Sequence, residues 1–127
     1  MADIKDGYLY TKEHEWLKLD GRECSVGISP FAVEQLGDVT LVAIDVKEGD
    51  TVTVGKAFGT VESVKTLSDL FAPVSGQVLR IHRELDQQPE LVNADCYAAW
   101  MVVIETTEEP KDLLDAAAYR EFLKTQG

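Results

Sequence analysis

The chain has 127 residues, of which 45% are hydrophobic and 28% charged, and this composition is typical of one soluble globular domain spanning residues 1–127. Its 23 acidic residues outnumber its 12 lysines and arginines, and the net charge of −11 argues against nucleic acid or an acidic membrane surface as a partner. No apolar stretch is long enough to cross a membrane, and residues 1–6 contain neither a secretory core nor an arginine-rich leader, so we expect a cytosolic protein.

The first third of the chain predicts short strands followed by one helix. The predicted strands are residues 8–10, 15–19 and 22–28. Asp20-Gly21 between the last two is a tight-turn signal, which indicates a hairpin. Ser29 can cap a helix with Pro30 in its first position, and Gly37 can take the left-handed conformation that ends it.

The middle of the chain predicts more short strands, separated by glycine and proline turns. These strands are residues 38–46, 51–54, 57–64, 68–72, 77–81 and 97–104. Residues 82–92, which include Pro89, predict a longer connection. Segments 46–52 and 72–78 are weakly similar, which suggests two half-sheets facing each other. Many short strands with frequent turns indicate a small β-sandwich or barrel.

The last segment predicts a helix over residues 110–124, opened by Pro110. Leu114, Ala117, Ala118 and Phe122 fall on one face at helical spacing, so we expect this face to pack on the body of the protein.

Lys65 is the residue that most strongly suggests a function. It stands between two predicted strands, on a turn at one exposed end of the fold, with Glu62 and Asp69 nearby. A single lysine on a turn is a poor catalyst but a good attachment point, which indicates a carrier whose chemistry is on a bound group. The neighbouring acids favour the charged amine, so acylation requires an enzyme with an activated donor. From the pattern alone, an ordinary surface lysine is the alternative.

The other reactive side chains do not form a predicted site. His14 and His82 lie far apart and lack a supporting cluster, so no metal site is predicted. Cys24 and Cys96 have neither metal nor redox spacing, and we expect them to be reduced and buried. No nucleophile elbow or phosphate loop is present, so the chain is predicted not to be a self-contained enzyme.

Over nearly its whole length the chain resembles the H-protein family of the glycine cleavage system, the lipoyl carriers. The segments that carry the resemblance are Tyr10-Thr-Lys-Glu-His-Glu-Trp16, Val26-Gly-Ile28, Gln35-Leu-Gly-Asp38, Val61-Glu-Ser-Val-Lys65, Ser68-Asp69, Ala72-Pro-Val-Ser-Gly76 and Pro89-Glu-Leu-Val-Asn93. Glu-Ser-Val-Lys followed by Ala-Pro-Val-Ser-Gly at this spacing is highly specific.

The resemblance implies a mainly β barrel-sandwich hybrid, like other lipoyl and biotinyl domains, with short flanking helices and a C-terminal helix. It implies that lipoate is bound in amide linkage to Lys65 within the motif Glu62-Ser63-Val64-Lys65. Glu15 and Asp69 match positions near the loaded arm, where carboxylates can pair with an aminomethyl cation. For Glu15, a structural hydrogen bond near Trp16 is an equal alternative.

The implied activity is that of a non-catalytic carrier. Lipoyl-Lys65 would accept an aminomethyl group from glycine decarboxylase and present it to aminomethyltransferase. Dihydrolipoamide dehydrogenase would then reoxidise the dithiol, and a lipoate-attaching enzyme would load Lys65 in the first place. We expect a monomer, because such a carrier must visit several enzymes.

Two departures from the family pattern leave the cargo open. Phe31 stands where many members have a histidine that helps to hold the arm, and Cys96 replaces a proline in a shortened loop. An H-protein-like lipoate-binding protein that carries sulfur for a heterodisulfide-reductase-like complex is the alternative within the carrier class. Cys96 would then be an extra thiol near the dithiolane, although a buried structural role is the simpler expectation. A relay in lipoate assembly is a third hypothesis.

Overall fold

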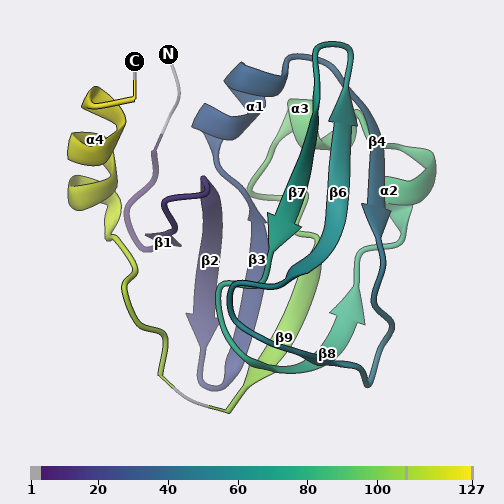
Figure 1. The fold of residues 1–127 in the computed structure, drawn as a ribbon, viewed down its shortest axis with the longest axis vertical. Coiled ribbons are helices and arrows are strands. Elements are labelled where there is room, and N and C mark those ends of the chain that lie inside the picture. The colour runs from purple at the N-terminus through teal and green to yellow at the C-terminus, as the bar shows by residue number, and fades with distance from the viewer. Residues whose placement is uncertain (1–3, 108, 127) are drawn as a thin grey trace.

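Two antiparallel sheets enclose the hydrophobic core of the protein, which we describe from a computed structural model over residues 4–107 and 109–126. The larger sheet has the strand order β1-β2-β3-β9-β8-β5, and the smaller sheet has the order β4-β6-β7. In Figure 1 the smaller sheet lies in front of the larger one, and the turn between β6 and β7 stands at the top of the molecule, near α1. The predicted mainly β barrel-sandwich is confirmed.

The strands are β1 (Leu9–Tyr10), β2 (Glu15–Asp20), β3 (Glu23–Ile28), β4 (Val39–Ile44), β5 (Thr51–Val52), β6 (Ala57–Ser63), β7 (Leu67–Phe71), β8 (Gly76–Ile81) and β9 (Val102–Thr106). The helices are α1 (Pro30–Leu36), α2 (Glu84–Gln87), α3 (Leu91–Ala94) and α4 (Ala116–Lys124).

The core lies between the two sheets because each contributes one apolar face. Leu17 and Val26 of the larger sheet join Val42 and Val61 of the smaller sheet in one buried cluster. A second cluster, formed by Ile4, Tyr10, Trp16, Ala116 and Tyr119, joins α4 to the amino-terminal segment. The two ends of the described chain therefore pack against each other.

The hairpin of β2 and β3 and the helix α1 are found where the sequence predicts them. Ser29 caps α1 by accepting a hydrogen bond from Ala32 N at 3.2 Å, and Pro30 occupies the first turn. Gly37 follows the helix with a φ of 74°, a value that favours glycine. These signals are local, which explains why they could be found in the sequence.

Three predicted elements need correction. The connection over residues 82–92 contains the single-turn helix α2, and α3 begins within it at Leu91. The last strand begins at Val102 rather than at residue 97, because Asp95 accepts hydrogen bonds from Tyr97 N and Ala98 N and holds a turn there. Strand β5 ends at Val52, two residues before the predicted end.

The C-terminal helix is shorter than predicted. Leu114 is extended and exchanges backbone hydrogen bonds with Tyr10, at 2.7 and 2.9 Å, so the chain cannot be helical there. Asp115 then caps α4 by accepting from Ala118 N at 2.8 Å. The predicted packing face was wrong for the alanines, because Ala116 and Tyr119 are buried whereas Ala117 and Ala118 are exposed.

Candidate functional site

Lys65 lies in the turn between β6 and β7, and Ser63 organises this turn. Ser63 Oγ accepts hydrogen bonds from Lys65 N at 3.2 Å and Thr66 N at 3.1 Å. Its hydroxyl donates to Thr66 O at 3.2 Å, and Ser63 N donates to the same oxygen at 2.8 Å. The turn is thus closed by a buried side chain, while Lys65 itself is exposed.

The lysine turn rests on the segment that follows α1. Val64 N donates to Asp38 O at 3.1 Å. The aliphatic part of Lys65 lies over Gly37, since a Cβ placed on this glycine would stand 3.3 Å from Lys65 Cε. No ion pair is found between Lys65 and either predicted acid, Glu62 or Asp69, in the part of the chain that the structure describes.

Asn93 of α3 holds this supporting segment in place. Its Nδ2 donates to Gly37 O at 2.8 Å, and its Oδ1 accepts from Val39 N at 2.8 Å. The side chain therefore binds the backbone on both sides of Asp38, whose carbonyl oxygen receives Val64 N. Sequence reasoning placed Asn93 only within a family motif and gave it no role.

A small pocket of about 130 Å³ lies beside the lysine turn, between α1, the segment before β2, and β7. Its lining combines apolar and carboxylate side chains and consists of Glu13, His14, Glu15, Ile28, Ala32, Gln35, Leu36, Val61, Thr66, Ser68, Asp69 and Leu70. We call it the arm pocket. It brings together the predicted residues Glu15 and Asp69, whereas Glu62 and Val64 are exposed and are not part of its lining.

Glu15 is a buried carboxyl group at this pocket, with only 2% of its surface exposed. Its Oε2 accepts a hydrogen bond from Phe71 N at 2.6 Å, on the open edge of β7. Burial is the main cause that raises the pKa of Glu15 to about 8, against the lowering effect of the Phe71 hydrogen bond. The expected structural bond therefore exists, but its partner is Phe71 rather than a group near Trp16.

His14 is a half-buried turn residue beside the same pocket. Its φ is 69°, and its Nδ1 lies 2.8 Å from the hydroxyl oxygen of Tyr119. The ring packs against Phe31, with centroids 4.6 Å apart, and burial lowers the pKa of the imidazole. Phe31 is thus an aromatic support for His14.

Cys96 lies outside the arm pocket. Cys96 is buried and lines a different hollow of about 420 Å³ with Pro30 and Val33, on another side of α1, and it does not line the arm pocket. Burial raises the pKa of Cys96 to about 11 and that of Cys24 to about 12. Both thiols are free and buried, as expected, and among the described residues no contact joins Cys96 to Lys65.

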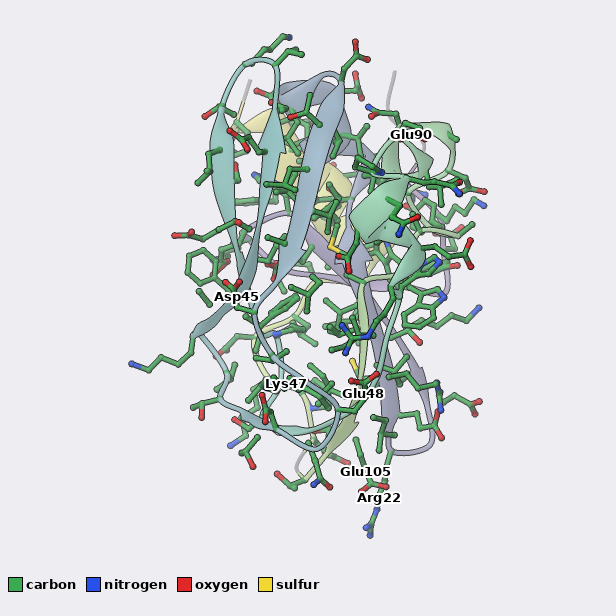
Figure 2. All side chains as sticks on the ribbon, turned by 90° about the vertical axis from the view of Figure 1, so that its right-hand side faces the viewer. Arg22, Asp45, Lys47, Glu48, Glu90 and Glu105 are labelled. Carbon is green, nitrogen blue, oxygen red and sulfur yellow. The ribbon has the colours of Figure 1, made fainter. Side chains whose placement is uncertain are left out.

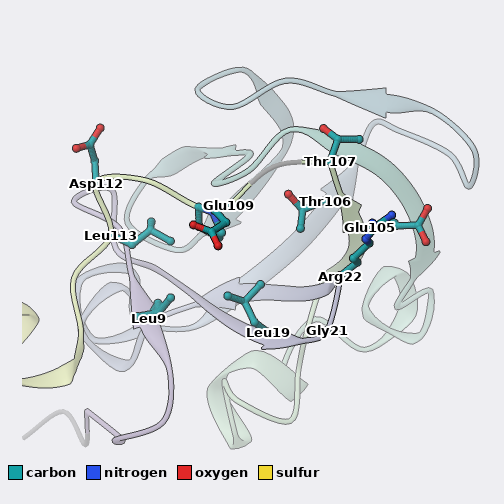
Figure 3. A pocket seen from close by; sticks show the side chains of 11 residues that line it. Leu9, Leu19, Gly21, Arg22, Glu105, Thr106, Thr107, Glu109, Asp112 and Leu113 are labelled. Carbon is teal, nitrogen blue, oxygen red and sulfur yellow. The ribbon is translucent and has the colours of Figure 1, made fainter.

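Other surface features lie away from Lys65. A hollow of about 850 Å³ lies between the β2–β3 turn and the connection to α4, and its lining includes Leu9, Leu19, Arg22 and Glu105 (Figure 3). Figure 2 shows charged side chains on another face, among them Glu48, which pairs with Arg83 at 2.6 Å. Over residues 4–107 and 109–126, no group of three potential metal ligands comes together, and no helix is both long and apolar enough to cross a membrane.

Comparisons with known proteins identify relatives over nearly the full length. The family model of the glycine cleavage H-protein matches residues 8–126. A glycine cleavage system H protein from Koribacter versatilis is 51% identical over 123 residues, which cover 95% of this chain and 91% of the relative. One from Acidobacterium capsulatum is 47% identical over 121 residues, with 94% and 93% covered. The crystal structure of a glycine cleavage system H protein from Mycobacterium marinum gives a TM-score of 0.88 at 35% identity, covering 95% of this chain and 99% of that one.

Proposed function

The chain belongs to the glycine cleavage H-protein family, and we propose that it acts as the lipoyl carrier of that system with lipoate in amide linkage on Lys65. The observation that carries the assignment to Lys65 is its exposed position on an ordered turn beside the arm pocket. Glu62, Ser63 and Val64 complete the attachment motif, and Ser63 gives the turn its shape.

Attachment requires an activated donor from a separate enzyme. The amine of Lys65 attacks the carbonyl carbon of activated lipoate, a carbon–nitrogen bond forms, and the bond to the leaving group breaks. The ammonium group of Lys65 releases two protons in this step, so one positive charge is lost from the protein. The exposed amine is accessible to such an enzyme, and in the described part of the chain no carboxylate holds it in an ion pair.

The residues around the arm pocket fit an arm that ends in a cation. When bound, the lipoyl dithiol supplies the sulfur that accepts the aminomethyl group. Ile28, Leu36 and Val61 provide apolar contacts along the pocket. Asp69 places a carboxylate where a protonated amine can be paired, and a bound cation favours ionisation of the buried carboxyl group of Glu15 beside it.

The proposed partners follow from membership of the system. The carrier has no catalytic group of its own in this proposal, and it passes between glycine decarboxylase, aminomethyltransferase and dihydrolipoamide dehydrogenase after a lipoate-attaching enzyme has acted. The sulfur-carrying alternative and the relay in lipoate assembly gain no support from the contacts of Cys96 or from the relatives described above.

Intact-mass analysis tests the attachment. Incubation with a lipoate–protein ligase, lipoate and Mg-ATP should add one lipoyl group to the wild type and to Lys56→Ala, an exposed turn lysine elsewhere. Lys65→Ala should remain unmodified. Glycine–bicarbonate exchange with a glycine decarboxylase should then require the lipoylated form. An unmodified wild type, or a modification that persists in Lys65→Ala, would refute the proposal.

A further inference from the structure

Exposed apolar side chains gather around the lysine turn. Five large hydrophobic residues are strongly exposed within the described ranges, and two of them, Leu19 and Val54, lie elsewhere on the surface. The other three flank Lys65, namely Leu41 at 42%, Val64 at 67% and Leu67 at 57% exposure. Single exposed leucines are ordinary, but a group of them at one functional end of a protein indicates an interaction surface.

A bulge in the backbone of β4 directs Leu41 to the surface. Val39 pairs with Ser63, and both are buried, whereas Leu41 pairs with Glu62 after a shift in register. Thr40 is the extra residue of this bulge, and its hydroxyl donates to Glu62 O at 3.1 Å. Without the bulge, Leu41 would point to the same side as Val39, into the core.

Leu41 and Leu67 form a row on the outer face of the smaller sheet. Leu41 and Leu67 are each the direct cross-strand partner of Glu62, so the three side chains are neighbours on one face. The next pair, Val42 and Val61, is buried on the opposite face. We call these two leucines, together with the exposed turn residue Val64, the outer apolar row. None of its members lines the arm pocket.

We propose that the outer apolar row is the docking surface for the enzyme that attaches lipoate to Lys65. This inference rests on the proposed function. The attaching enzyme must bring the amine of Lys65 itself into its active site, so it has to cover the residues next to the turn. The enzymes that act later react with the far end of a long arm, so their chemistry does not require the nitrogen of Lys65 in the active site.

The chemistry of the surface defines the partner. Glu62 lies between Leu41 and Leu67, and Asp38 is exposed, so the surface combines apolar and acidic side chains on a chain with a net charge of −11. The complementary enzyme surface offers apolar contacts to the two leucines and a lysine or arginine that pairs with the carboxylate of Glu62 between them. The two sides of the lysine turn then have separate functions. The outer apolar row binds the attaching enzyme, and the arm pocket binds the loaded arm.

The test compares two matched double variants. Leu41→Thr with Leu67→Thr alters the row, while Leu19→Thr with Val54→Thr changes two exposed aliphatic residues at a distance, and threonine keeps a preference for strands. With lipoate and Mg-ATP, the row variant should show a KM for the carrier raised about tenfold at unchanged kcat. The distant variant should behave as the wild type. Acetylation of Lys65 by a small activated ester should proceed equally in all three proteins, because it needs no docking.

Three results would overturn the inference. Equal KM values for both variants would show that the row is not used. Slower acetylation of Lys65 by the small ester in the row variant would show that the substitutions distort the turn. Normal lipoylation combined with a loss of glycine–bicarbonate exchange would assign the row to the decarboxylase instead. If the wild type itself is not modified on Lys65, the proposed function fails as well.

Discussion

The aliphatic chain of Lys65 lies on Gly37, which has a positive φ and where an added Cβ would make a tight contact with the lysine. A Cβ on Gly37 would stand 3.3 Å from Lys65 Cε and 3.7 Å from its Nζ. The lysine is therefore exposed at its tip but supported along its length. Its direction depends on a glycine 28 positions earlier in the chain.

Gly37→Ala should destabilise the fold and displace Lys65. A non-glycine residue at a φ of 74° costs about 1 kcal/mol or more, and the new methyl group also contacts the lysine. Gly49→Ala is the matched control, because Gly49 has a φ of 93° and open space around it. Both variants should lose similar stability in chemical unfolding, but only Gly37→Ala should change the NMR signals of the Lys65 side chain. If the NMR signals of the Lys65 side chain are the same in Gly37→Ala and Gly49→Ala, the contact between Lys65 and residue 37 is refuted.

Asn93→Ala should loosen the support of the lysine turn. The substitution removes the hydrogen bonds to Gly37 O and from Val39 N, so a loss of about 1–2 kcal/mol is expected. Amide hydrogen exchange should accelerate at Val39 and Val64 more than at Val61 in the core. Asn93→Asp keeps the acceptor for Val39 N and loses the donor to Gly37 O, so its effect on Val39 should be smaller. Unchanged amide hydrogen exchange at Val64 in Asn93→Ala would show that Asn93 does not support the lysine turn.

The lysine turn could be predicted because its signals are local. Strand-forming residues, glycines and a proline lie within a few positions of Lys65, and the structure forms β6, the turn and β7 there. The contacts that support the site could not be predicted in the same way. Asn93 and Gly37 are 56 positions apart, as are Glu15 and Phe71, and neither pair has a signature in the pattern of either segment.

Local sequence patterns also failed where a contact distant in sequence sets the conformation. Residues 110–114 are predicted as helix because Pro110 and the leucines suit one, but Leu114 pairs with Tyr10 and Asp112 has a φ of 59°, so α4 begins only after Asp115. Leu41 belongs to the predicted strand 38–46, whose pattern does not show which side chains face outward, and the bulge at Thr40 turns it to the surface. In both places a partner distant in sequence decides the conformation.

Tyr119→Phe should weaken the attachment of α4 to the segment that positions the arm pocket. The hydroxyl of Tyr119 lies 2.7 Å from Ser29 Oγ and 2.8 Å from His14 Nδ1, and Ser29 is fully buried. Its loss should cost about 1–3 kcal/mol, because a buried polar group is left without this partner. Combining it with Ser29→Ala should cost less than the sum of the two single losses, as measured by urea unfolding. Additive losses would show that the two hydroxyl groups act independently.

The stability of the protein should depend on pH through Glu15. Its pKa is raised from 4.5 to about 8 in the folded state, so the folded protein holds the proton more tightly than the unfolded chain does. The resulting stabilisation is complete below pH 4.5, decreases as the pH rises to about 8, and is absent above that value. Relative to Glu15→Gln, which mimics the protonated group, the wild type should lose roughly 2–4 kcal/mol of unfolding free energy over this range.

Unfolding by urea at several pH values between 4.5 and 9 measures this effect. Glu34→Gln is the control, because it removes one charge from the exposed side of α1 and should leave the pH dependence of the wild type unchanged. A cation bound in the arm pocket favours the ionised carboxylate of Glu15, so the carrier loaded with an aminomethyl group should lose part of the slope. If the unfolding free energies of the wild type and Glu15→Gln change in parallel with pH, the carboxyl group of Glu15 has the same pKa in the folded and unfolded states. That result would contradict the prediction.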